Sequence, residues 1–123
     1  MATTSTPLRR RARRLGRAGI FGFGLLAVSA CSPQHWITTH FDSAGQVDNA
    51  NKIVQCESNF DPGAVSPTND HGLFQINAVH RADFERVTGQ PWSKVYDPQY
   101  NAMYARWLFD QQGWNPWTCK KVL

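Results

Sequence analysis

The sequence predicts a mainly helical domain that is small and follows a targeting segment. Three observations support this fold class. From about residue 46 onward apolar residues recur at helical spacing, alternating strand patterns are nearly absent, and turn-forming residues separate the helical stretches. The 123 residues suffice for one small domain with an additional segment, and a hydrophobic content of 41% excludes wholesale disorder.

The positive charge is concentrated near the N-terminus. Six of the 13 basic residues lie between positions 9 and 17, where no acidic residue occurs. Residues 31–123 carry seven Lys and Arg against nine Asp and Glu, so the net charge of +4 belongs to the leading segment. The body of the chain is mildly acidic, and its overall charge therefore does not favour nucleic-acid binding.

Residues 1–30 are typical of a secretory signal peptide. The arginines precede 13 uncharged residues, a stretch shorter than the roughly 20 residues that span a bilayer. The sequence Val-Ser-Ala-Cys at 28–31 resembles the lipobox of bacterial lipoproteins. That resemblance implies cleavage before Cys31, lipid modification of Cys31, and an exported, membrane-anchored protein that faces the cell wall or periplasm. A plain signal peptide with a chance cysteine nearby is the alternative.

Residues 31–46 are expected to form a lipidated tether. From Ser32 to about Gly45 the chain mixes Pro, Gln, Thr, Ser and Gly without periodicity, which is typical of a linker. The folded domain is then expected to span residues 47–123.

Four helical stretches are expected in this domain. They cover approximately residues 46–58, 73–77, 79–87 and 97–112. The last has the clearest boundaries, because Asp97 is a favourable N-cap, Pro98 suits the first helical position and Gly113 is a favourable terminator. Residues 59–70 are rich in Asn, Asp, Pro, Gly and Ser and are expected to form a loop.

The chain has three cysteines, Cys31, Cys56 and Cys119. An odd number in an exported protein leaves one thiol to be explained. Lipidation would use Cys31, and Cys56 and Cys119 can then pair in an oxidising compartment. Closing a loop of that size contributes about 4 kcal/mol in the chain-entropy model. Two buried free thiols are the alternative.

Glu57 is the candidate catalytic residue. It follows Ile53 and Val54 by four and three positions, and so lies on the apolar side of its expected helix. A poorly solvated carboxyl group has a raised pKa, and glycoside cleavage needs a carboxylic acid that still holds its proton. By position alone, a solvated surface glutamate is the more common outcome.

An ordered series of motifs resembles the soluble lytic transglycosylase (SLT) domain of the lysozyme-like superfamily. Cys-Glu-Ser-Asn-Phe-Asp-Pro at 56–62 is followed by Ala-Val-Ser at 64–66 and Gly-Leu-Phe-Gln-Ile-Asn at 72–77. Asn101 and Ala105 fit the family's Asn-x-x-x-Ala element. The resemblance covers about residues 47–119. It implies a compact goose-type/SLT helical fold with a glycan groove, and Glu57 as the acid/base.

Four side chains are candidates for substrate binding. Ser58 and Gln75 match residues of the family, Asn77 belongs to the same motif, and Tyr104 lies one helical turn after Asn101. The alternatives are helix termination for Ser58 and a structural hydrogen bond for Gln75, and core packing is favoured for Tyr104. Trp114 and Trp117 are expected to pack the chain end around the disulfide, and stacking on sugar rings is the alternative.

Asp70 departs from the transglycosylase pattern. Animal c-type lysozymes place a second carboxylate two residues before the glycine that corresponds to Gly72, so Asp70 is a possible nucleophile or electrostatic stabiliser for hydrolysis. Asp61, at the family's turn position, is a poorer candidate. The 14 residues between Glu57 and Gly72 match the transglycosylase length and leave little room for the β-sheet wing of c-type lysozymes.

The predicted function is cleavage of the β-1,4 bond between N-acetylmuramic acid and N-acetylglucosamine in peptidoglycan. Transglycosylation to 1,6-anhydro ends is favoured over hydrolysis, with a non-catalytic glycan-binding domain or a structural lipoprotein as alternatives. No cofactor or metal is expected, because His71 and His80 lack metal-ligand spacing. The expected partners are glycan strands and, through Cys31, the membrane; the protein is expected to be a monomer.

Overall fold

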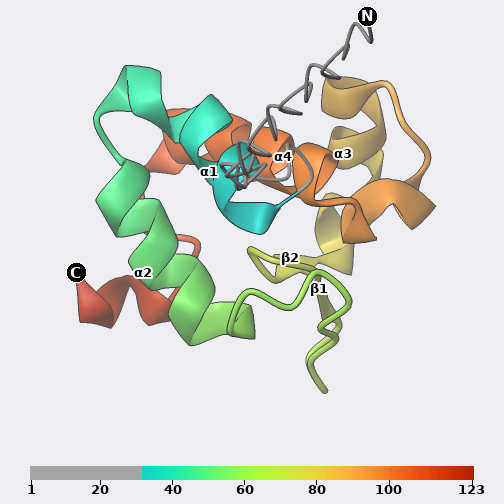
Figure 1. Ribbon diagram of the computed structural model, residues 1–123. Coiled ribbons are helices and arrows are strands. Elements are labelled where there is room, and N and C mark those ends of the chain that lie inside the picture. Colours follow the sequence, from blue (N-terminus) through green and yellow to red (C-terminus); the bar gives the residue numbers. More distant parts are fainter. Residues whose placement is uncertain (1–31) are drawn as a thin grey trace, which may run out of the picture.

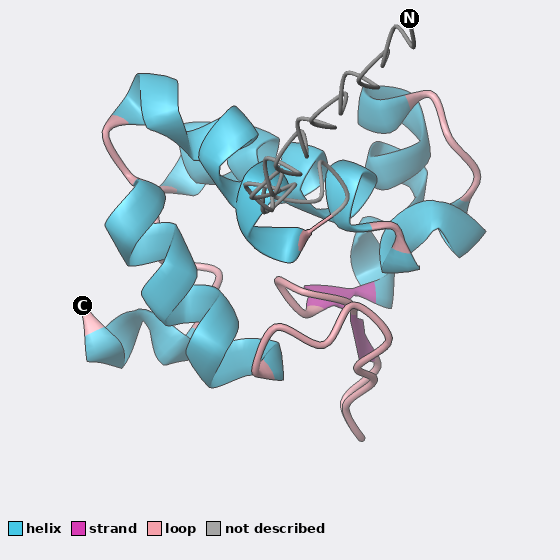
Figure 2. Ribbon diagram, in the orientation of Figure 1, coloured by secondary structure: helices cyan, strands magenta, loops and turns pink. Residues whose placement is uncertain are grey.

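The computed structural model describes residues 32–123, and helices dominate that part of the chain (Figures 1 and 2). The α-helices are α1 (Pro33–Phe41), α2 (Val47–Ser58), α3 (Arg81–Thr88) and α4 (Pro98–Gln112). Short 3-10 helices are η1 (Asp42–Ala44), η2 (Ala78–His80), η3 (Trp92–Tyr96) and η4 (Thr118–Val122). A small sheet contains β1 (Asp70–His71) and β2 (Ile76–Asn77). The predicted mainly helical class is confirmed.

The segment expected to be a tether is instead partly a helix of the folded domain. In α1 the side chains of Ile37 and Phe41 are fully buried. The Phe41 ring stacks on Phe74 at 5.4 Å between centroids. Ser32 caps the helix, and Pro33 occupies its first turn. The composition of residues 32–45 therefore misled the prediction, because two apolar residues four positions apart suffice to anchor a nine-residue helix.

The predicted signal peptide and Cys31 lie outside the described residues. Within residues 32–123, no helix is both long enough and apolar enough to cross a membrane.

Three of the expected helices are present. The boundaries of α2 and α4 agree with the predictions, and α3 with η2 covers the segment expected at 79–87. The caps of α4 are those expected from sequence, because the Asp97 side chain accepts a hydrogen bond from the Gln99 amide at 3.0 Å and Gly113 ends the helix. Helix α2 ends at Ser58, and the C-cap residue Asn59 has a left-handed φ of 52°.

The prediction of a helix at residues 73–77 is wrong. These residues form a turn that leads into β2, which pairs antiparallel with β1 so that Asp70 lies opposite Asn77. Left-handed φ values of 76° at Gly72 and 50° at Gln75 interrupt any helical run. With two residues in each strand, the hairpin is too short to show an alternating sequence pattern.

Asn101 of α4 fixes the turn of this hairpin. Its buried amide oxygen accepts a hydrogen bond from the Phe74 amide at 2.9 Å. Its Nδ2 donates to the carbonyl oxygens of His71 at 3.1 Å and Val95 at 2.8 Å. A Cβ atom on Gly72 would lie 2.4 Å from Asn101 Nδ2 and 2.6 Å from the Val95 oxygen. Glycine at this position therefore allows α4 and the hairpin to approach closely.

The predicted pairing of Cys56 with Cys119 is confirmed. The disulfide joins the last turn of α2 to η4, with a Cα–Cα distance of 6.0 Å across a sequence separation of 63. The chain end is thereby fixed alongside α2 (Figure 1).

Candidate active site

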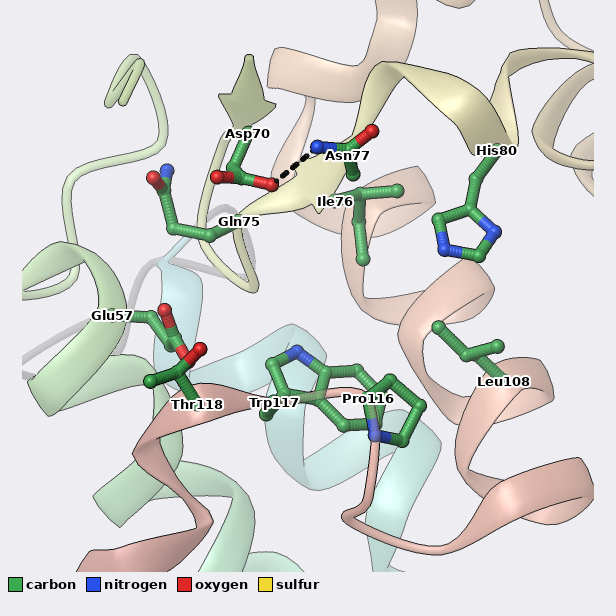
Figure 3. Close-up of a pocket in the computed structure, with 10 residues that line it drawn as sticks. All are labelled: Glu57, Asp70, Gln75, Ile76, Asn77, His80, Leu108, Pro116, Trp117 and Thr118. Carbon is green, nitrogen blue, oxygen red and sulfur yellow. Dashed lines mark hydrogen bonds between the residues drawn. The ribbon is translucent and has the colours of Figure 1, made fainter. Parts of the chain in front are cut away.

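A pocket forms where the end of α2, the hairpin and the C-terminal segment meet (Figure 3). The residues that line it are Glu57, Asp70, Gln75, Ile76, Asn77, His80, Leu108, Pro116, Trp117 and Thr118. In Figure 3 Glu57 and Thr118 lie at one end, and His80 and Leu108 lie at the other. The lining is polar at the carboxylate end and more apolar along Trp117 and Leu108.

Glu57 projects into the pocket from the last turn of α2, half-buried. Burial is the main reason that its pKa is raised above the usual value, because the charged form is poorly solvated. The Cys119 amide opposes this shift by donating to Oε1 at 3.1 Å. The negative charge of Asp70 raises the pKa further, and Lys121 lowers it. The net effect favours a carboxylic acid that retains its proton.

The pKa of Asp70 on β1 is shifted in the opposite direction from that of Glu57. Partial burial alone would raise its pKa, but hydrogen bonds from Ser66, Thr68 and Asn77 outweigh burial, and His71 acts in the same direction. Oδ2 accepts from Ser66 Oγ at 2.6 Å and from Thr68 Oγ1, and Oδ1 accepts from Asn77 Nδ2 at 2.9 Å. The pKa of Asp70 is therefore below its usual value, which favours the carboxylate.

The pocket thus contains two carboxyl groups whose pKa values are shifted apart. Glu57 comes from α2 and Asp70 from the hairpin, so the two groups approach from different elements (Figure 3). Pairs of this kind separate an acid from a carboxylate in glycosidase sites. The sequence length left little room for a β-sheet wing, yet two residues per strand are enough to bring Asp70 to the pocket.

The side chains of Gln75 and Asn77 line the pocket but are also engaged in the structure. Gln75 Nε2 donates to the carbonyl oxygens of Ala64 at 3.2 Å and Gly72 at 2.9 Å. Asn77 Nδ2 donates to Asp70 and also to the Thr68 carbonyl oxygen at 2.9 Å. These contacts favour the structural alternative for Gln75 and make Asn77 a positioning residue for Asp70.

Ser58 and Tyr104 are not among the residues that line this pocket. The Ser58 hydroxyl donates to the Val54 carbonyl oxygen at 3.2 Å within α2. Tyr104 is fully buried and packs near Phe84, with 5.6 Å between ring centroids. Burial raises the pKa of Tyr104 to about 12, and its hydroxyl has no hydrogen-bond partner among residues 32–123. The described contacts therefore favour helix termination for Ser58 and core packing for Tyr104.

Trp117 lines the pocket, as do several residues that were not anticipated. Trp117 packs in the core as expected, and its Nε1 donates to the Phe74 carbonyl oxygen at 2.8 Å, but its ring also lines the pocket. His80 and Leu108 reach the pocket from η2 and α4. The sequence carried no signal that placed His80 or Leu108 at a pocket. In the described part of the chain, no group of three or more potential metal ligands is found.

Comparison with known families gives one finding that bears on this pocket. The family model of the Transglycosylase SLT domain matches residues 42–113, more than half of the chain. The matched range includes Glu57, the hairpin and Asn101, and it ends before the C-terminal lining residues and Cys119. Comparisons with curated proteins and with solved structures gave no significant match.

Proposed function

The chain belongs to the Transglycosylase SLT domain family, and from that premise we propose that it cleaves the muramic acid–glucosamine β-1,4 bond and leaves 1,6-anhydro ends. The family implies lytic transglycosylase activity on peptidoglycan. For this chain, the observation that supports the proposal is Glu57, a carboxyl group with a raised pKa at one end of a pocket.

In the proposed reaction Glu57 first acts as an acid. It gives its proton to the glycosidic oxygen, and the acetamido group of the muramic acid assists departure of the leaving sugar. The Glu57 carboxylate then removes the proton from the muramyl 6-hydroxyl as that oxygen bonds to C1. The ring closes without water, and Glu57 is again protonated.

Substitution Glu57→Gln tests this role. The amide has nearly the same shape but no proton of suitable acidity, so cleavage is expected to fall by about 10²–10⁴-fold while binding to insoluble peptidoglycan is retained. Release of muropeptides from purified sacculi measures cleavage, and sedimentation with sacculi measures binding. Glu85→Gln is the matched control, because Glu85 lies on α3 outside the pocket lining. Full cleavage by E57Q would contradict the proposal, and binding without cleavage by the wild type would identify a non-catalytic module.

Hydrolysis is a second candidate because of the hydrogen bonds that hold Asp70 as a carboxylate. A carboxylate beside the reacting carbon could stabilise positive charge or form a glycosyl intermediate that water resolves. Mass spectrometry separates the two reactions, since the anhydro product lacks one water relative to the hydrolysed one. Reducing muramyl ends that disappear in D70N would favour hydrolysis. An unchanged rate and product in D70N, as expected for the control D61N, would exclude Asp70 from the chemistry.

The SLT family and the disulfide suggest an extracytoplasmic site of action at the cell wall. We further propose that the mature protein begins at a lipid-modified Cys31, a residue outside the described range. Mass spectrometry of the mature N-terminus tests this. A terminal Cys31 with acyl chains is expected, and an unmodified terminus at another residue would contradict the anchor.

A further inference from the structure

We propose that the Cys56–Cys119 disulfide positions the Glu57 carboxyl group for proton transfer, by holding the peptide N–H of Cys119 against Oε1 so that the proton is borne by Oε2. This inference rests on the proposed acid/base function of Glu57. It adds a positioning role for a bond whose first expected effect is on stability.

The geometry connects the disulfide to the carboxyl group from both sides. Cys56 immediately precedes Glu57 in the last turn of α2. Its bonded partner, Cys119, donates its own peptide N–H to Glu57 Oε1 at 3.1 Å. One covalent bridge therefore joins the helical turn that bears the acid to the peptide group that contacts the acid.

The hydrogen bond distinguishes the two carboxyl oxygens. In a protonated carboxyl group the carbonyl oxygen is the better acceptor, and the other oxygen is the hydroxyl donor. Because the Cys119 N–H points at Oε1, the favoured arrangement places the proton on Oε2. After transfer the carboxylate keeps the same N–H contact, and Oε2 can accept the proton of the muramyl 6-hydroxyl. Both proton transfers then use one oxygen in one orientation.

The disulfide is the main constraint on this part of the chain end. Trp117 is fixed independently, because it is buried and its indole N–H is bonded to Phe74. Beyond it Thr118 is exposed, as are residues 120–123, whereas Cys119 is only 7% exposed. The backbone hydrogen bonds of η4 are short-range, such as that from the Lys120 amide to the Trp117 carbonyl oxygen at 3.2 Å, and the bridge is its covalent link to α2.

A titration of the wild-type protein by NMR tests the contact without any change to the disulfide. If the Cys119 N–H is bonded to Glu57, its chemical shifts should change with the same midpoint as the Glu57 side-chain carboxyl carbon. The transition in the Cys119 amide should be absent from E57Q. A Cys119 amide that does not respond at the Glu57 midpoint would overturn the proposal. This readout does not require enzymatic activity.

The double variant C56A/C119A tests whether the disulfide contributes to catalysis by positioning Glu57. Its kcat on peptidoglycan fragments is expected to fall by about 10- to 100-fold with KM within about twofold, because the acid is misplaced while the lining residues other than Thr118 lie outside η4. The midpoint of Glu57 should also rise, since an N–H that favours the carboxylate has been lost. Assays are run at a temperature at which circular dichroism shows the variant to be folded.

Asp97→Ala is the control for destabilisation alone. It removes the side-chain cap at the start of α4. Asp97 itself does not line the pocket, so the substitution should lower stability without changing kcat or the Glu57 midpoint. A folded C56A/C119A protein with wild-type kcat and midpoint would overturn the positioning role. If that variant does not fold, the wild-type titration tests the proposed contact, and a Cys119 amide that does not respond to Glu57 overturns the proposal. If the wild type does not cleave peptidoglycan, the proposed function is wrong. The titration still tests the hydrogen bond between the Cys119 amide and Glu57.

Discussion

The position of Glu57 lowers the stability of the folded protein when its carboxyl group is ionised. Burial raises its pKa in the folded state above the value in the unfolded chain. The folded protein therefore binds a proton more tightly than the unfolded one. Stability from this group is complete below the unfolded pKa and falls as the pH rises through the folded pKa. The raised pKa that suits Glu57 to proton donation thus also means that its ionisation weakens the fold.

This reasoning predicts a pH-dependent gain of stability in E57Q. The variant should be more stable than the wild type at about pH 8, and the difference should shrink at about pH 3.5, where Glu57 is protonated in both states. Urea denaturation at the two pH values measures the difference. Asp48→Asn, which removes an exposed carboxylate from the first turn of α2, should give no such gain at pH 8. A difference between E57Q and the wild type that does not vary with pH would contradict a raised pKa.

At the level of single residues, α2 formed where the sequence predicted it, and Glu57 in its last turn lines the pocket. Spacing did not decide which neighbours face the pocket. The Ser58 hydroxyl turns back to its own helix, and Tyr104 faces the core although it is one turn from Asn101. His80 could not be identified, since its place depends on how η2 packs against α4 and on the hairpin.

At the level of elements, the hairpin depends on a helix 30 residues away in sequence. Asn101 satisfies the Phe74 amide in the turn, the His71 carbonyl group of β1 and the Val95 carbonyl group of η3. Because the hairpin also carries Asp70 and Gln75, the same side chain supports one wall of the pocket.

Replacement of Asn101 by alanine should therefore be strongly destabilising. Three hydrogen bonds are lost and buried backbone groups are left without partners, which should cost about 3–5 kcal/mol in the free energy of unfolding. Urea denaturation measures the loss. Asn115→Ala is the matched control, because Asn115 is exposed and donates only to the nearby Gln112 carbonyl oxygen, so its effect should be about 1 kcal/mol or less. A similar effect of the two substitutions would contradict the role of Asn101.

The success of prediction also differs between elements. The limits of α4 were predictable because Asp97, Pro98 and Gly113 act locally. The hairpin and α1 were not, because both depend on distant partners. The turn uses Asn101, and Phe41 of α1 packs against Phe74 and Trp114.

At the level of the whole molecule, the disulfide closes most of the folded chain into one loop. Its sequence separation of 63 corresponds to a loss of unfolded-state entropy worth about 4 kcal/mol at 25 °C. We expect C56A/C119A to lose about that amount of stability in urea denaturation, as a fully reduced wild-type sample should. A loss below about 1 kcal/mol would show that the bridge contributes little to the fold.

The cap of α1 has a consequence for where such an enzyme can work. Because Ser32 already belongs to the folded body, an acylated Cys31 would be separated from it by one peptide unit, about 3.8 Å between Cα atoms. The pocket would then stay within a short distance of the lipid headgroups. A ten-residue Gly/Ser insertion after Cys31 should increase wall damage in intact cells but leave digestion of isolated sacculi unchanged; equal damage in cells would show that reach is not limiting. The distance between the bilayer and the wall would therefore limit how much peptidoglycan the anchored protein can reach.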